Sequence, residues 1–297
     1  MNKINNLKTK PLVSIGMPIK NGFINKHSND INLTKALNSV LSQSYKNIEI
    51  IISNNCSTDE TKYYLEKISK IDKRIKLYNQ KKQISPGENF QYVLDQASGK
   101  YFKWNAADDL ISEDYIEKNV EFLEINSDYL FSSSRFYYED RPEILHSFNL
   151  DLDLYNRIKG FFDIRDVSHN IFYSLIRREI MSKVTNVGMD YWAIDWIINL
   201  ELLLNGKFKT INNGYVGFGI NGVSRQTSFF DNKAVYIKKK IYRIIPFYEL
   251  IKIIIKKITF SKKLSLIEKF YIYFLLVKIN LTFHKRHSFK VIKKLLF

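Results

Sequence analysis

The segment Tyr101-Phe-Lys-Trp-Asn-Ala-Ala-Asp108-Asp109 joins a strand-like run to a pair of aspartates. Three of its first five residues are aromatic, which favours a buried strand over 101–105. Two carboxylates at the end of a strand are the oxygen ligands that Mg²⁺ and Mn²⁺ prefer. Taken alone, the pair favours a polar turn before a helix starting near Ser112, with Asp109 helping to cap that helix.

Upstream of this segment, short apolar runs alternate with amphipathic helical patterns. The predicted strands cover 13–18, 48–53, 75–78 and 101–105, and the predicted helices cover 33–41, a segment opened by the capping-box pattern Ser57-x-x-Glu60, and 89–97. Such alternation predicts an α/β fold with a mostly parallel sheet flanked by helices. Ligands of such sheets bind at the carboxyl ends of the strands.

Downstream, an apolar helix is predicted between Met189 and Gly206, with Asp195 set between Ile194 and Trp196. Burial in such surroundings raises the pKa of a carboxyl group, as a general base requires. Asn199, four residues on, shares its helix face. The alternative is a structural aspartate that caps the helix or pairs with an arginine.

A third pattern, Gly217-x-Gly219-x-x-Gly222, spells the dinucleotide-binding motif. A dinucleotide site needs this motif to open a helix and an acidic residue about 20 residues later. Neither follows here, and we interpret these glycines as a turn in a loop.

Charge divides the chain of 297 residues unevenly. Its formal net charge is +16, yet residues 233–297 hold 17 basic and 2 acidic residues, which places a boundary near residue 230. The single cysteine, Cys56, excludes an internal disulfide and a cysteine-rich zinc module. The N-terminal residues MNKINNLKTK lack the apolar stretch of a signal peptide, so we expect a cytoplasmic protein.

The basic segment alternates lysines with isoleucines at helical spacing, as at Ile251, Ile254, Ile255 and Ile258. Its longest uncharged apolar run, residues 270–277, is far shorter than a bilayer-spanning helix. We expect basic amphipathic helices that associate peripherally with an anionic membrane. The alternative is a helical subdomain packed on the main domain. Nucleic acid is not expected as a partner, because no recognition motif accompanies the charge.

Four motifs in order carry a resemblance to a known family. They read Pro18-Ile-Lys-Asn21, Asn54-Asn-Cys-Ser57-Thr-Asp59-Glu-Thr61, Ala97-Ser-Gly99-Lys-Tyr101 and Ala106-Ala-Asp108-Asp109. In this order they resemble the family 2 glycosyltransferases, which have the GT-A fold. Asp195 and Gly206 keep the spacing of that family's acceptor helix, although Ile194 stands where an acid is usual. The resemblance covers about residues 11 to 225 and implies a nucleotide-sugar half (11–120), an acceptor half (121–230), an extension (1–10) and the basic tail (231–297).

The resemblance implies an inverting, metal-dependent glycosyltransferase. It would move a sugar from a nucleotide-diphosphate donor, with UDP favoured, to a saccharide or lipid-linked saccharide in surface polysaccharide or lipopolysaccharide synthesis. Asp195 would be the catalytic base, and Asp108 with Asp109 would bind Mn²⁺ or Mg²⁺. The implied donor-binding residues are Pro18, Asn21, Asn54, Ser57, Asn89, Asp108 and Arg225.

Three positions depart from the family pattern. Ala106 replaces the first acid of Asp-x-Asp, Asn54 replaces an aspartate, and Glu88-Asn89 replaces Arg-Asn. Two other functions remain open. A nucleotidyltransferase would need a Gly-rich phosphate loop, of which Lys20-Asn21-Gly22-Phe23 is a poor example. A non-enzymatic membrane or nucleic-acid adaptor would leave the aspartates without a role.

Overall fold

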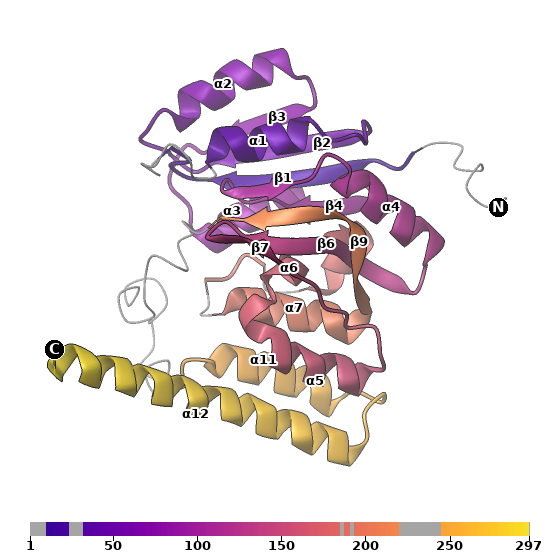
Figure 1. Ribbon diagram of the computed structural model, residues 1–297, viewed down its shortest axis with the longest axis vertical. Coiled ribbons are helices and arrows are strands. Elements are labelled where there is room, and N and C mark those ends of the chain that lie inside the picture. The colour runs from indigo at the N-terminus through magenta and orange to yellow at the C-terminus, as the bar shows by residue number, and fades with distance from the viewer. Residues whose placement is uncertain (1–9, 24–31, 185–186, 191–192, 220–244, 297) are drawn as a thin grey trace.

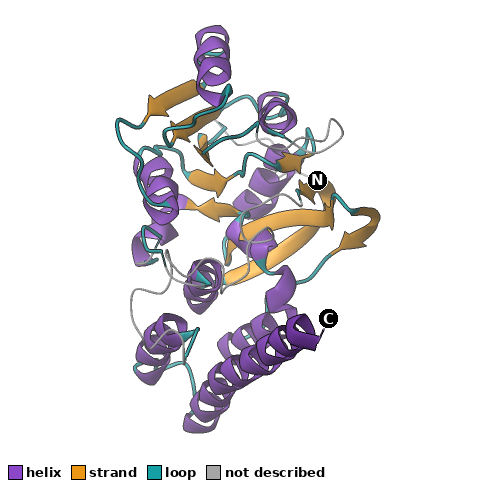
Figure 2. Ribbon diagram, turned by 90° about the vertical axis from the view of Figure 1, so that its left-hand side faces the viewer, coloured by secondary structure: helices purple, strands orange, loops and turns teal. Residues whose placement is uncertain are grey.

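The computed structural model describes residues 10–23, 32–184, 187–190, 193–219 and 245–296 (Figure 1). Arg225, Gly222, most of the N-terminal extension and the expected boundary near residue 230 lie outside these residues. The predicted α/β fold is confirmed: one curved sheet runs through the molecule with helices packed on its faces (Figure 2).

The first half of the chain forms the parallel half of the sheet, in the order β3-β2-β1-β4. Its strands are β1 (Val13–Ile19), β2 (Ile48–Asn54), β3 (Ile75–Asn79) and β4 (Tyr101–Trp104), and its helices are α1 (Leu33–Leu41), α2 (Thr61–Ile71) and α3 (Pro86–Asp95). Every residue of β2 is buried. Its central isoleucines, Ile50 to Ile52, are what a strand covered on both faces requires.

The second half extends the sheet in the order β4-β8-β6-β9-β5, with β7 beside β6. Its strands are β5 (Asp109–Ile111), β6 (Tyr129–Tyr138), β7 (Arg141–His146), β8 (Leu175–Arg177) and β9 (Lys207–Phe218), and its helices are α4 (Tyr115–Ile125), α5 (Leu154–Ile164), α6 (His169–Phe172) and α7 (Ile194–Asn205). Only β6 and β9 pair in parallel here, so we call this the mixed half.

Two helix starts differ from the sequence expectation. Ser57 does not cap α2, because its hydroxyl accepts the backbone N–H of Asn21 at 2.9 Å, and α2 begins later, at Thr61. The capping box is at α3, where Ser85 and Glu88 bond each other's backbone N–H groups. The prediction at Ser57 was wrong because a neighbouring loop takes the hydroxyl that the pattern assigns to the helix.

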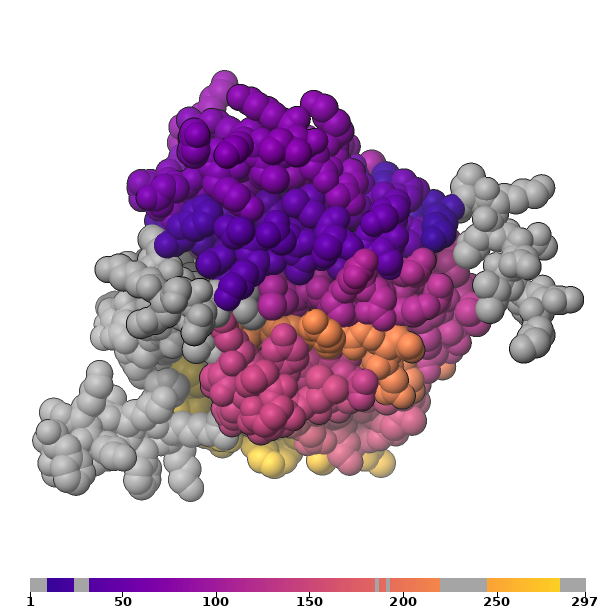
Figure 3. Space-filling view, turned by 45° about the horizontal axis from the view of Figure 1, so that its top comes forward, coloured from indigo at the N-terminus to yellow at the C-terminus, as the bar shows by residue number. Residues whose placement is uncertain are grey.

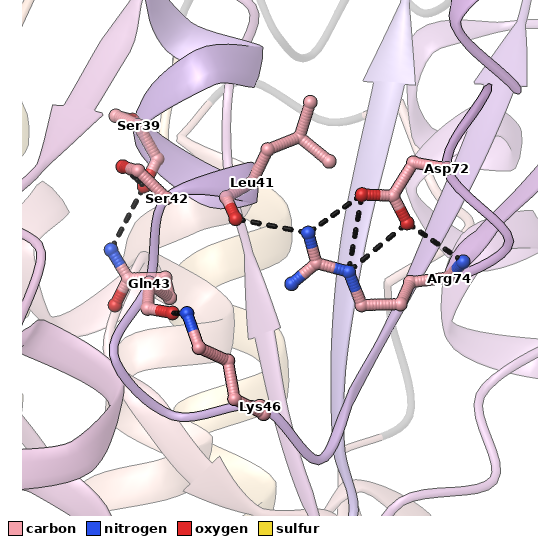
Figure 4. Close-up of polar contacts among 7 residues, drawn as sticks. All are labelled: Ser39, Leu41, Ser42, Gln43, Lys46, Asp72 and Arg74. Atoms are coloured by element: carbon pink, nitrogen blue, oxygen red, sulfur yellow. Dashed lines mark hydrogen bonds and ion pairs between the residues drawn. The ribbon is translucent and has the colours of Figure 1, made fainter.

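The C-terminal end of α1 is fixed by side chains from the loop that follows it and from the turn between α2 and β3 (Figure 4). Arg74 Nη2 donates to the carbonyl of Leu41 at 2.9 Å and to Asp72 Oδ2 at 2.6 Å. Gln43 Nε2 donates to the carbonyl of Ser39 at 2.9 Å. These bonds satisfy carbonyl groups that a helix end leaves without a partner, and Arg74 ties the end of α1 to the turn before β3.

The basic segment forms two helices, α11 (Tyr248–Thr259) and α12 (Leu266–Leu296), as its periodicity predicts. They pack beneath α5 and α7 (Figure 1). Lys257 of α11 forms a 2.9 Å ion pair with Glu201, which is fully buried in α7. The packing expected of a helical subdomain is therefore present. None of the helices described has the length and hydrophobicity that crossing a bilayer requires.

Candidate active site

Strands β2, β1 and β4 lie side by side and run in parallel, so their carboxyl ends share one edge of the sheet. Asn54 is the last residue of β2, and Asn21 and Asp108 follow the ends of β1 and β4. Pro18 lies one residue before the end of β1, opposite Ser53. The structure therefore brings four predicted donor-site positions to one edge.

The β1 and β2 loops are tied together by backbone groups. Asn21 has a left-handed backbone (φ 54°), which turns its amide toward Ser57, and its Oδ1 accepts the N–H of Thr58 at 2.8 Å. Asp59 Oδ2 accepts the N–H of Phe23 at 2.9 Å. Burial acts to raise the pKa of Asp59, but hydrogen bonds from Thr61 and Phe23 outweigh it, so the pKa is lowered. Asp59 is thus a fixed anion that holds the two loops in register.

The amides of Asn54 and Asn89 are both buried and both bonded within the fold. Asn54 Nδ2 donates to Asn79 Oδ1 at 2.8 Å. Asn89 Oδ1 accepts the hydroxyl of Ser53 at 2.6 Å, which joins α3 to β2. Their observed role is to position strand ends, and their contact with a donor remains a prediction.

The two aspartates of the acidic pair face different surroundings. Asp109 is buried as the first residue of β5, and its Oδ1 accepts the N–H of Gly219 at 3.2 Å. Asp108 remains partly exposed. A Cβ on Gly219 would lie 2.3 Å from the carbonyl oxygen of Asp108, so only glycine fits against this turn.

The interpretation of Gly217 and Gly219 as a loop turn was wrong for Gly217, whereas Gly219 follows the end of β9. Gly217 is a residue of strand β9, where it pairs with Leu110 of β5. A Cβ on Gly217 would meet the Tyr137 hydroxyl at 2.6 Å. Both glycines serve close packing, because they let β9 approach its neighbours near the acidic pair.

Sequence reasoning missed Lys103, a fully buried residue of β4 beneath the acidic pair. Its Nζ donates to the carbonyl of Tyr173 at 2.5 Å. Burial lowers the pKa of Lys103 to about 7, and the charge of Asp109 opposes this shift. A lysine within an otherwise aromatic strand is the signal that could have marked it.

Tyr173 shows that the distant aspartates converge. Its pKa is raised well above the usual value by burial first, and then by the charges of Asp109, Asp108 and Asp195. Charges act strongly on a buried group only from nearby, so the three carboxylates lie near this phenol. The loop after β4, which holds Asp108, and the first turn of α7, which holds Asp195, therefore lie on the same side of the molecule, close to Tyr173.

Asp195 lies in the first turn of α7, two residues after Ala193, whose backbone is left-handed (φ 58°). Burial raises the pKa of Asp195 to about 6, although the amides of Trp196 and Asp195 itself partly oppose the shift. Left-handed backbone at a non-glycine residue is strained and occurs at functional sites. The side-chain amide of Asn199 is directed toward another segment than Asp195. Its Nδ2 donates a hydrogen bond to the carbonyl of Ser168 at 3.0 Å.

Contacts with α3 position the segment before α7. The N–H of Gly87 donates to Asp190 Oδ1 at 2.9 Å, and a Cβ on Gly87 would lie 2.7 Å from the carbonyl oxygen of Met189. This close approach joins the parallel half to the segment that leads to Asp195. On the face shown in Figure 3, the parallel half (indigo and purple) meets the mixed half (magenta to orange) along one boundary.

Comparison with known proteins agrees with this geometry. The family model "Glycosyl transferase family 2" matches residues 14–185, which is more than half of the chain. The chain belongs to glycosyltransferase family 2. The matched span of this family 2 protein contains all four motifs of the parallel half and ends before Asp195.

Curated relatives of this family 2 protein match shorter segments. An uncharacterized glycosyltransferase of Haemophilus influenzae is 42% identical over 94 residues, 32% of this chain and 29% of the relative. A putative teichuronic acid biosynthesis glycosyltransferase, TuaG of Bacillus subtilis, is 33% identical over 38% of this chain and 42% of its own length. A GalNAc(5)-diNAcBac-PP-undecaprenol beta-1,3-glucosyltransferase of Campylobacter jejuni is 35% identical over 31% and 30%. The chain thus spans less than half of these relatives.

Solved structures extend the likeness to most of the fold. S. aureus TarS (residues 1–349) superposes with a TM-score of 0.67 at 16% identity, covering 93% of this chain and 74% of TarS. The same TarS fragment is known in complex with UDP-GlcNAc, with a TM-score of 0.64 at 17% identity over 88% and 70% of the two chains. The mannosyltransferase PcManGT of Pyrobaculum calidifontis, in complex with GDP-Man and Mn²⁺, has a TM-score of 0.54 at 14% identity over 86% and 67%. At these identities the likeness establishes the GT-A fold.

The acidic pair of this glycosyltransferase fits a divalent ion only in part. Among the described residues, no group of three or more histidine, cysteine, aspartate or glutamate side chains could hold a metal. Asp109 is committed to Gly219 and lies beside Lys103, which leaves the partly exposed Asp108 as the better ligand. Magnesium is commonly bound by one or two carboxylates together with substrate phosphates. Asp108 fits that arrangement once a diphosphate is bound.

Proposed function

We propose that this protein is an inverting glycosyltransferase that moves a sugar from a UDP-sugar to the hydroxyl of a saccharide or lipid-linked saccharide. The observation that carries the proposal is the convergence of Asp108, Asp109 and Asp195 around Tyr173. Family membership supports sugar transfer, and the proximity of the three carboxylates supports its two chemical requirements: a place for a charged leaving group and a base.

The donor is proposed to bind at the carboxyl ends of β1, β2 and β4. Pro18 and Asn21 would shape the pocket for the nucleoside, while Asn54 and Ser57 would contact the base. Asn89, through Ser53, would support the same edge, and Arg225 would add a cation toward the phosphates. The complex of TarS with UDP-GlcNAc supports the choice of UDP.

Mn²⁺ or Mg²⁺ is proposed as the cofactor, with Asp108 as its main protein ligand and Asp109 behind it. When bound, the ion would neutralise the charge of the departing nucleoside diphosphate. PcManGT with its bound Mn²⁺ supports this assignment. The residues of the chain hold Asp108 in place through the tight turn against Gly219.

Asp195 is proposed to accept the proton of the acceptor hydroxyl. The hydroxyl oxygen forms the new bond to the anomeric carbon while the bond to the diphosphate oxygen breaks on the opposite face. The bonding electrons leave with the nucleoside diphosphate, and the configuration inverts. With a pKa of about 6, Asp195 is mostly ionised at neutral pH and still more basic than an ordinary aspartate.

A lipid-linked acceptor and a role in surface polysaccharide or lipopolysaccharide assembly are proposed from two relatives. One acts on an undecaprenol-linked glycan, and the other is assigned to teichuronic acid synthesis. Such an acceptor would place the protein peripherally on the inner face of the cell membrane, held by residues 233–297. Nucleic acid is not part of the proposal.

A donor screen tests the function. Purified protein is incubated with several nucleotide sugars and Mn²⁺, and released nucleoside diphosphate is measured with and without a saccharide acceptor. We expect release of UDP from one UDP-sugar, stimulated by acceptor. Formation of pyrophosphate from a nucleoside triphosphate and a sugar phosphate would instead show a nucleotidyltransferase and contradict the proposal.

A further inference from the structure

Helix α12 exposes a second apolar face, on the side away from the domain. Ile267, Phe270, Phe274, Val277 and Leu281 recur at spacings of three and four residues, which places them on one side of the helix. Ile267 is 82% exposed, Phe270 70% and Phe274 58%. We call these five residues the α12 apolar face.

Packing of the fold does not account for this face. The residues that attach α12 to the domain are Ile272, Leu276 and Ile279, all buried on the opposite side of the helix. Scattered apolar residues are normal on protein surfaces, but a contiguous apolar stripe marks a site of interaction. The α12 apolar face therefore has the character of a surface that binds something outside the domain.

The charge around this face is positive. Lys278 is exposed on the same side of α12 between Phe274 and Leu281, and Lys262 and Lys263 are exposed in the turn before the helix. The two acidic residues of α11 and α12 do not belong to this positively charged surface. Glu249 is buried on α11, and Glu268 bonds Ser265 at the start of α12. A binding partner complementary to this surface has an apolar interior to receive the apolar side chains and negative charges at its surface to pair with the lysines.

A cavity of about 410 Å³ lies at the same end of the helix pair. Phe260, 79% exposed, stands at its edge, next to the start of the α12 apolar face. Lys257 is paired with Glu201, but the remaining lysines leave the cavity positive. The cationic side chains that line it are Lys183, Lys257, Lys262 and Lys263.

We propose that the α12 apolar face inserts into the interface of an anionic phospholipid bilayer, and that the lysine-lined cavity receives a lipid phosphate head group. Aromatic and aliphatic side chains enter the acyl boundary, while lysines extend their amines to the head-group level. Anionic lipid strengthens such binding by roughly fivefold for each lysine near the surface. This inference names the residues for the proposed membrane location and does not depend on sugar transfer.

Flotation of the full-length protein with lipid vesicles tests the proposal. The vesicles contain either phosphatidylcholine alone or an equal mixture of phosphatidylcholine and phosphatidylglycerol. We expect wild-type protein to float with the mixed vesicles and F270S/F274S to bind them at least about tenfold more weakly. K262Q/K263Q should lose affinity for the mixed vesicles and change little with phosphatidylcholine alone.

Matched controls come from the other end of the molecule. I71S/I125S removes two isoleucines that are each 69% exposed, and K81Q/K82Q removes two adjacent exposed lysines. Both controls should bind like the wild type, and all variants should keep the wild-type melting temperature. The proposal is overturned if wild-type protein stays unbound, or if F270S/F274S binds as well as I71S/I125S. Light scattering provides the alternative outcome. If the wild type is a dimer that does not bind vesicles, and only F270S/F274S is a monomer, the α12 apolar face binds a second copy of the chain.

Discussion

The loops of the parallel half and the first turn of α7 hold their aspartates in opposite ways. Asp59 accepts backbone N–H groups from both β1 and β2 loops, and these bonds lower its pKa despite burial. Burial instead raises the pKa of Asp195 to about 6, against the opposing amides of Asp195 itself and Trp196. The first carboxylate stabilises a loop arrangement, and the second is available to take a proton. The same residue type thus serves structure at Asp59 and, in our account, proton transfer at Asp195.

The largest expected effect is at Asp195. D195N keeps the shape of the side chain but removes the proton acceptor, so transfer should fall by about a hundred- to ten-thousandfold. Initial rates with saturating donor and acceptor measure this. Donor affinity, from calorimetric titration with UDP, should change less than about twofold. D163N, an exposed aspartate on α5, is the control and should keep wild-type rates.

A smaller effect is expected at Asp108. D108N should weaken binding of the UDP-sugar at least about tenfold when Mn²⁺ is present, because a carboxylate ligand is lost. When a chelator replaces Mn²⁺, D108N and the wild type should bind the UDP-sugar with equal affinity. This result would separate a loss of metal binding from a loss of folding. If D108N and the wild type bound the UDP-sugar with equal affinity in the presence of Mn²⁺, Asp108 would not be a metal ligand.

The pH dependence of transfer sharpens the comparison. Protonated Asp195 cannot accept a proton, so the rate should fall about tenfold for each pH unit below about 6 and level off above it. An aspartate with an ordinary pKa would keep the rate flat to about pH 4. A profile of kcat/KM between pH 4.5 and 8 at constant ionic strength decides between these two forms.

The smallest effect is expected at Asp59. D59N should lower the free energy of unfolding by about 1–3 kcal/mol, because charge-assisted bonds to Phe23 and Thr61 are weakened. Since folding lowers the pKa of Asp59, its ionised form stabilises the fold above the unfolded pKa, and this contribution is lost as pH falls through the folded pKa. Denaturant melts at pH 7 and pH 3 measure the difference, with E60Q as the control.

Should D59N melt like E60Q at both pH values, the loop network would carry no stability, and the contrast with Asp195 would fail. The rate at neutral pH provides a second check, because Asp59 supports the donor loops from a distance. A loss in D59N should appear as weaker donor binding with kcat retained.

The sequence predicted the parallel half better than the mixed half for a physical reason. Buried parallel strands such as β2 carry runs of isoleucine at their centre, and helices separate them. In contrast, β8 has three residues and β5 begins with Asp109, so neither carries a readable periodicity. The antiparallel pairs they form depend on distant partners that no local pattern shows.

The residues of the candidate site likewise divide into those that a local sequence pattern predicts and those that only long-range contacts reveal. Asp108 and Asp195 were predicted from motif order; the charges of both raise the pKa of Tyr173, and their roles stay predictions. Tyr173 and Lys103 were missed, because their importance comes from burial beside residues far along the chain. Ser57 was predicted as a helix cap, yet its hydroxyl accepts the Asn21 amide, a contact that only the fold creates.

The most direct test of the central claim is a crystal structure of D195N with Mn²⁺ and the UDP-sugar chosen by the donor screen. The account predicts that the diphosphate lies beside Asp108, with the anomeric carbon facing residue 195 across open space for an acceptor hydroxyl. Electron density for the sugar at another edge of the sheet, or with its diphosphate toward residue 195, would contradict the account.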